Sequence, residues 1–156
     1  MPNNNGSEAV ANKCNKAIGD KPNALSPTIL ETIGIAASLG GNHLGCAQGP
    51  SILQESRGFN QSCQEGGIKL KWQPLLVASE EQDHKVAIKN ICQQAAQISE
   101  NFCIKNTPFL FLCGEHTYAM GIWRGVMQGL LTQRKKMALI WIDAHMDAHT
   151  FITSPS

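Results

Sequence analysis

The chain has 156 residues, 42% of them hydrophobic and 16% charged, and a formal net charge of +1 at pH 7. This length and composition are sufficient for one soluble domain with a sizeable core. There is no basic stripe with interleaved aromatic residues, which argues against nucleic-acid binding, and no uninterrupted apolar stretch is long enough to cross a bilayer.

The N-terminal stretch is polar and shows no clear hydrophobic period, so we expect residues 1–27 to form an arm. It lacks the charged and apolar regions of a secretory signal. The six cysteines are scattered without Cys-x-x-Cys spacing. Together these features favour reduced thiols and a cytoplasmic location over a disulfide framework.

From residue 28 onward, patterns typical of buried strands alternate with patterns typical of amphipathic helices. We predict strands at 32–38, 69–77, 109–113 and 139–142, helices at 50–57, 81–102 and 117–136, and a loop at 58–67. Thr117 is a plausible N-cap of the last helix. This alternation predicts an α/β domain with a parallel sheet, in which sites form beyond the carboxyl ends of the strands.

The strand predicted at 139–142 is followed by a potential ligand at every second position, namely Asp143, His145, Asp147 and His149. If the backbone stays extended, all of these side chains lie on the same side. Carboxylate and imidazole donors suit a divalent ion of the manganese, iron or zinc kind, and the absence of thiolates from the cluster argues against a closed structural zinc site.

Helix caps and hydrogen-bonded packing are the alternative roles for these acids and histidines. We favour a metal site, because a cluster of buried acids is costly without a cation.

His116 follows the strand predicted at 109–113, so two neighbouring parallel strands would deliver it and the Asp143 cluster to the same edge of the sheet. A metal there would lower the pKa of a bound water from about 15.7 toward about 7, and Asp143 could bridge two ions roughly 3.5 to 4 Å apart. Cys113, close to His116, is expected to be a plain buried thiol rather than a reactive one.

Three segments resemble the N-terminal signatures of the ureohydrolases, the arginase and agmatinase family: Gly45-Cys-Ala-Gln-Gly-Pro50, Gly114-Glu-His-Thr-Tyr-Ala-Met-Gly121 and Asp143-Ala-His-Met-Asp147. The resemblance extends from about Thr32 to the last residue. It implies a three-layer α/β/α fold with a parallel sheet, a binuclear manganese site and hydrolysis of a small guanidinium substrate to release urea. By motif position, His116 and Asp147 would bind one manganese, His145 the other, and Asp143 would bridge them.

Within the family the resemblance favours arginase, which converts L-arginine to L-ornithine and urea. His149 stands where an asparagine commonly contacts the amino-acid carboxylate of the substrate, and Ser156 would match a substrate-contacting serine. Because His149 departs from that asparagine, an agmatinase or formiminoglutamase-like activity remains an alternative. Glu115 replaces the usual Asp before the ligand histidine, and we expect it to act as a partner of that ligand.

The family's later Asp-x-Asp motif and its catalytic histidine would follow Ser156, so we assign no catalytic residue. We therefore expect residues 28–156 to be the N-terminal part of a single ureohydrolase domain, a truncated fragment with weak metal binding and no turnover, and the complete protein to be a homo-oligomer. A non-catalytic binding protein with a partial metal site, or an unrelated α/β domain whose acids are helix caps, are the remaining alternatives.

Overall fold

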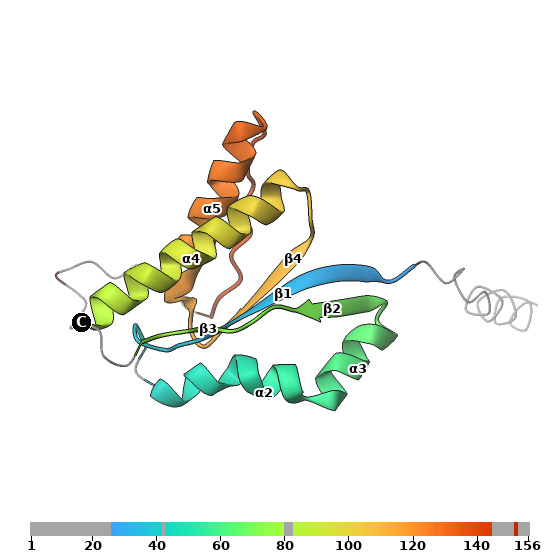
Figure 1. Ribbon diagram of the computed structural model, residues 1–156, viewed down its shortest axis with the longest axis horizontal. Helices are drawn as coiled ribbons and strands as arrows, with labels where there is room; N and C mark the ends of the chain where they lie inside the picture. The colour runs from blue at the N-terminus through green and yellow to red at the C-terminus, as the bar shows by residue number, and fades with distance from the viewer. Residues whose placement is uncertain (1–25, 42, 80–82, 145–151, 153–156) are drawn as a thin grey trace, which may run out of the picture.

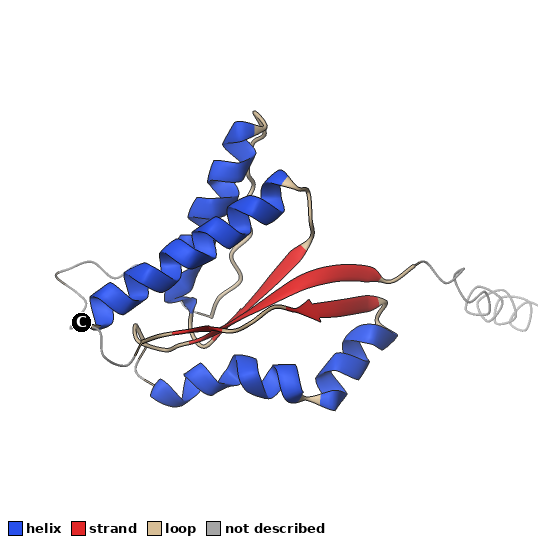
Figure 2. Ribbon diagram, in the orientation of Figure 1, coloured by secondary structure: helices blue, strands red, loops and turns tan. Residues whose placement is uncertain are grey.

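The computed structural model describes residues 26–41, 43–79, 83–144 and 152. A parallel sheet lies between two layers of helices, which confirms the predicted α/β/α architecture (Figures 1 and 2). The elements in chain order are β1 (Thr28–Ala36), the 3-10 helix η1 (Leu44–Gln48), α2 (Gly49–Glu55), α3 (Arg57–Glu65), β2 (Ile68–Trp72), β3 (Leu76–Val77), α4 (His84–Ile104), β4 (Phe109–Cys113), the 3-10 helix η2 (His116–Tyr118) and α5 (Ala119–Thr132). The predicted arm, except for Ser26 and Pro27, lies outside the described residues.

Strand β1 is the centre of the sheet. It pairs in parallel with β2 through its first half and with β3 through its last residues, while β4 pairs with it in parallel from Glu31 to Ile35. Since β2 and β4 both pair with Glu31 and Thr32, they must lie on opposite edges of β1. The carboxyl ends of β1 and β4 therefore meet at the same edge of the sheet.

The core lies between the sheet and α4. Ile33 and Ile35 of β1 are buried, and α4 buries Ala87, Ile91 and Ala95 at helical spacing. Helices α4 and α5 cover this face of the sheet, and α2 and α3 cover the opposite face (Figure 1). The four consecutive positions from Thr32 to Ile35 are buried in β1, as expected for a strand that is covered on both faces.

Helices α4 and α5 pack unusually closely because α5 presents a glycine at every fourth position. A Cβ built on Gly125 would overlap the Ala96 carbonyl oxygen and the Ser99 hydroxyl of α4, and one on Gly129 would lie 2.8 Å from the Cβ of Cys103. Gly121, Gly125 and Gly129 are all buried. The glycines thus allow the two helix backbones to approach each other.

Several sequence-based boundaries were wrong for identifiable reasons. Residues predicted as a loop form α3, where the Ser56 hydroxyl accepts a hydrogen bond from the Phe59 amide and caps the helix. The strand predicted at 69–77 is interrupted between β2 and β3 by a segment containing Pro74, which has no N–H to donate to the ladder. Helix α5 ends at Thr132, earlier than predicted.

The strand predicted at 139–142 is absent, since these residues have no regular secondary structure. Ile140 is 84% exposed and Ile142 93% exposed, so the run is not the doubly covered strand that its composition indicated. A parallel strand needs a covering layer on each face. Within the described residues, this apolar run has no layer over its outer side, and its backbone lies exposed as an irregular segment.

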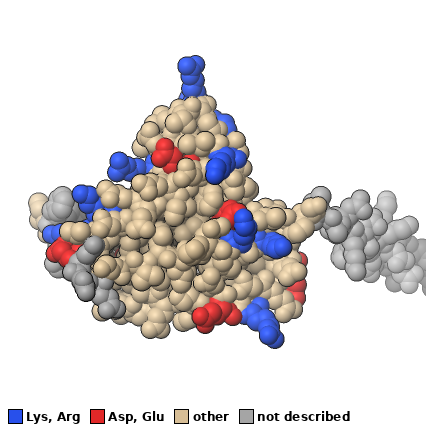
Figure 3. All heavy atoms as spheres, in the orientation of Figure 1, with Lys and Arg blue, Asp and Glu red and all other residues tan. Residues whose placement is uncertain are grey.

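The distribution of charged side chains on the surface agrees with the nearly equal numbers of basic and acidic residues, 13 and 12, in the sequence. On the face visible in Figure 3, acidic and basic side chains are interspersed rather than gathered into a stripe. None of the helices in the described residues combines the length and the hydropathy needed to span a membrane.

Candidate metal site

The loop after β4 packs directly on the loop after β1. A Cβ built on Gly114 would lie 2.8 Å from the carbonyl oxygen of Cys46, so only glycine permits this approach. Gly114 also donates its backbone N–H to the Ile35 carbonyl, at 3.2 Å. Next in the chain come Glu115 and His116, which places the predicted ligand at the carboxyl end of the sheet.

Glu115 holds these two loops together. Its Oε1 accepts a hydrogen bond from the Gly40 amide at 2.9 Å, and its Oε2 accepts one from the Thr117 hydroxyl at 2.6 Å. The buried Tyr118 adds a second connection, because its hydroxyl oxygen accepts a 3.3 Å bond from the Leu39 amide. One described bond of Glu115 therefore holds the backbone of the loop after β1, and the other holds a side chain of its own loop.

Thr117 is not the cap of α5. Its hydroxyl bonds to Glu115, and the N-cap of α5 is Tyr118, without a side-chain cap bond. The 3-10 helix η2, which spans His116–Tyr118, comes directly before α5. The prediction of the helix was right, but its cap was wrong, because η2 intervenes and places Thr117 two residues before the first residue of α5.

His116 is exposed and forms one wall of a cavity of about 450 Å³. The other walls come from the start of α5, with Met120 and Trp123, and from the segment after α5, with Leu139 and Trp141. The ring centroids of His116 and Trp141 are 6.2 Å apart, at 80° to each other. The segment that leads to Asp143 thus reaches His116, even though it is not a strand.

The structure describes two of the predicted site residues. His116 lies at the end of β4, and Asp143 lies on the segment packed beside it, with an exposed side chain. His145, Asp147, His149 and Ser156 lie outside the described residues. Among the residues that are described, no three His, Cys, Asp or Glu side chains form a group able to hold a metal ion.

The thiol of Cys113, the last residue of β4, has a strongly raised pKa. Burial, with the charges of Glu115 and Cys92 as smaller contributions, raises the pKa of Cys113 to about 12. Such a thiol remains protonated near neutral pH and is a poor nucleophile. This agrees with the interpretation of Cys113 as a plain buried thiol.

We expect iodoacetamide to alkylate Cys113 at least ~100-fold more slowly than Cys46 at about pH 8, because only the thiolate reacts. Cys46 is exposed and serves as the internal reference. Peptide mass spectrometry over a time course measures both rates in one sample. Equal rates, or faster labelling of Cys113, would contradict the buried-thiol interpretation.

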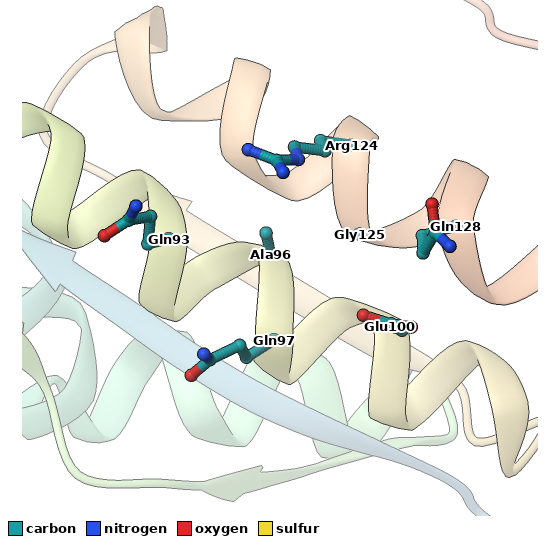
Figure 4. A pocket seen from close by; sticks show the side chains of 7 residues that line it. All are labelled: Gln93, Ala96, Gln97, Glu100, Arg124, Gly125 and Gln128. Atoms are coloured by element: carbon teal, nitrogen blue, oxygen red, sulfur yellow. The ribbon is translucent and has the colours of Figure 1, made fainter.

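A second hollow lies between α4 and α5. Figure 4 shows Gln93 and Glu100 of α4 and Arg124 and Gln128 of α5 around this groove of about 360 Å³. None of the predicted site residues that the structure describes lines it. The groove is therefore separate from the cavity at the end of β4.

Sequence reasoning missed two residues of the candidate site. Trp123 was assigned to the inner side of a helix and Trp141 to a buried strand, yet both line the cavity at His116. A signal was present, because Trp141 precedes Asp143 by two residues and so shares the period-2 side of the predicted ligands.

The chain is similar to known proteins over most of its length. Residues 30–156 match the model of the arginase family. The crystal structure of arginase from Bacillus subtilis is similar, with a TM-score of 0.63 and 24% sequence identity, over 83% of this chain and 42% of that one. This likeness shows a shared fold, over less than half of that arginase. No curated protein matched the chain. Since the family model covers most of its length, the chain belongs to the arginase family.

Proposed function

We propose that the protein containing this chain hydrolyses a guanidinium compound to release urea, with L-arginine as the first candidate substrate. The supporting observation is the position of His116 at the carboxyl end of β4, in an open cavity that the Asp143 segment also reaches. In this reaction, water adds its oxygen to the guanidinium carbon and the bond from that carbon to the substrate's alkyl nitrogen breaks. The leaving nitrogen takes a proton, which yields urea and L-ornithine.

The donor chemistry fits manganese. His116 offers an imidazole nitrogen and Asp143 a carboxylate oxygen, the donor types that such an ion takes in proteins. We propose that His116 and Asp147 bind one ion, that His145 binds a second, and that Asp143 bridges them. When bound, manganese would acidify a water molecule and so supply a nucleophile near neutral pH.

A second candidate substrate follows from residue 149. The family's arginases commonly place an asparagine where this chain has His149, and that asparagine contacts the substrate carboxylate. Agmatine is the decarboxylated counterpart of arginine and needs no such contact. We propose that His149 and Ser156 lie at the substrate's outer end and that they decide between the two compounds.

Urea release tests the proposal. The product of the complete reading frame is assayed with arginine and with agmatine, in Mn²⁺ and after chelation. Urea from arginine that disappears on chelation supports the arginase assignment, and faster release from agmatine supports the alternative. Binding of Mn²⁺ without urea release from either compound would leave a formiminoglutamase-like activity and a non-catalytic binding protein as the remaining alternatives. The 156-residue chain by itself is expected to release none.

We also propose that the complete protein is a cytoplasmic homo-oligomer. The scattered, unpaired cysteines of the described residues suit a reducing compartment. Sedimentation of the purified complete protein measures its assembly, and a monomer at micromolar concentration would contradict this part of the proposal.

A further inference from the structure

The segment after α5 returns along that helix toward the end of β4 (Figure 1). Within it, Trp141 touches two other rings. Its centroid lies 4.8 Å from that of Trp123 on α5 and 6.2 Å from that of His116, with interplanar angles of 80° in both cases. These are edge-to-face arrangements, the geometry that aromatic pairs prefer. Trp141 therefore connects α5 to the predicted metal ligand.

Exposure alternates along this segment. Leu139 and Trp141 are 50% and 44% exposed and line the cavity at His116, whereas Ile140 and Ile142 are 84% and 93% exposed. This alternation is typical of extended backbone, in which every second side chain lies on the same side. By the same period, position 143 follows positions 139 and 141 on the side of the cavity.

We propose that Trp141 is a positioning residue, whose indole packs against His116 and Trp123 and thereby holds the segment carrying Asp143 beside His116. This inference rests on the proposed metal site, since its consequence is that two ligands from separate parts of the chain are brought together before the metal binds. Neither ring contact requires a metal. The position of Asp143 relative to His116 then depends on Trp141 and not on strand pairing with β4.

The alternative is that the Trp141 side chain only covers apolar surface and does not position His116 or Asp143. In that case leucine should replace it with little effect on His116 or on the metal. The positioning role instead requires an aromatic ring, because only a ring supplies the edge-to-face contact with His116. The Trp141→Phe variant should therefore keep most of the contact with His116 and most of the metal affinity.

The first measurement uses the metal-free 156-residue chain. Imidazole ring signals are recorded by NMR, and that of His116 is identified by its loss in His116→Gln. We expect Trp141→Leu to shift the His116 signals, because the ring current of the indole is lost, and Trp141→Phe to shift them less. The matched control is Ile142→Ala, which changes an exposed side chain of the same segment and should leave His116 unchanged.

The second measurement is Mn²⁺ affinity, followed by the EPR signal of free Mn²⁺. Residues that orient metal ligands typically change affinity ~10-fold to 100-fold when replaced, so we expect about 10-fold weaker binding in Trp141→Leu. Trp141→Phe should remain within about threefold of the wild type, and Ile142→Ala within about twofold. Circular dichroism verifies that every variant is folded to the same extent.

The outcomes separate this inference from the proposed function. Unshifted His116 signals in Trp141→Leu would overturn the contact, whatever the metal does. Shifted signals with unchanged Mn²⁺ affinity would overturn the positioning role. If the wild-type chain bound no Mn²⁺ while the His116 signals still moved, the metal site would fail and the role of Trp141 toward the metal with it, although the ring contact would stand.

Discussion

Replacing His116 with asparagine is expected to weaken Mn²⁺ binding at least about 100-fold and to abolish urea release by the complete protein. Replacing even a residue that merely supports a ligand typically costs ~10-fold to 100-fold in metal affinity, so losing a ligand should cost at least as much. His116 is exposed at the end of β4, so its replacement should change the free energy of unfolding by no more than about 0.5 kcal/mol. Calorimetric titration with Mn²⁺ measures the metal affinity, and denaturation of the protein in urea measures the free energy of unfolding.

His84→Asn is the matched control for this prediction. His84 is likewise exposed, at the first turn of α4, and is not among the proposed metal ligands. We expect its Mn²⁺ affinity to equal that of the wild type. An equal loss in both variants would mean that Mn²⁺ binds histidines nonspecifically, and unchanged binding in His116→Asn would remove His116 from the ligand set.

The largest loss of stability is expected from Gly125→Leu. The side chain would have to enter the contact between α5 and α4, where even a Cβ overlaps the Ala96 carbonyl oxygen. Overpacking of a close contact costs about 1 to 3 kcal/mol, and here the obstacle is helix backbone, so we expect a loss of about 3 kcal/mol or more. Such a loss is a large part of the 5 to 15 kcal/mol that is typical of folded domains. Urea denaturation followed by circular dichroism measures it.

Gly58→Ala serves as the control because nothing lies within 4 Å of a Cβ built on Gly58 in α3. Alanine has a higher helix propensity than glycine, so this variant should be equally stable or more stable, by about 0.5 kcal/mol. If Gly125→Leu unfolded at the same urea concentration as the wild type, the close packing of α4 and α5 would be refuted.

The motif residues were accessible from the sequence because their chemistry is local. The apolar run of β4 and the helical period of α4 predicted these elements nearly to their observed bounds. Each element keeps the same surroundings along its length, so its hydrophobic pattern is regular and can be recognised in the sequence. The polar residues directly after β4 also placed His116 at a strand end. Family membership follows from the same short motifs and agrees with the match over residues 30–156.

Features that depend on contacts between residues distant in sequence could be learned only from the tertiary structure. The apolar run at 139–142 predicts a buried strand by composition alone, but a strand also needs layers on both faces, and Ile140 and Ile142 are exposed. Likewise, no sequence pattern pairs Glu115 with the Gly40 amide.

By itself, then, the sequence determined the α/β class, the donor types of the predicted metal site and the chain positions of those donors. Only the tertiary structure decided that Trp141 meets His116 and that the glycines of α5 admit the backbone of α4. The physical reason is that period and composition describe one segment at a time, whereas a contact depends on how two segments fit together in space.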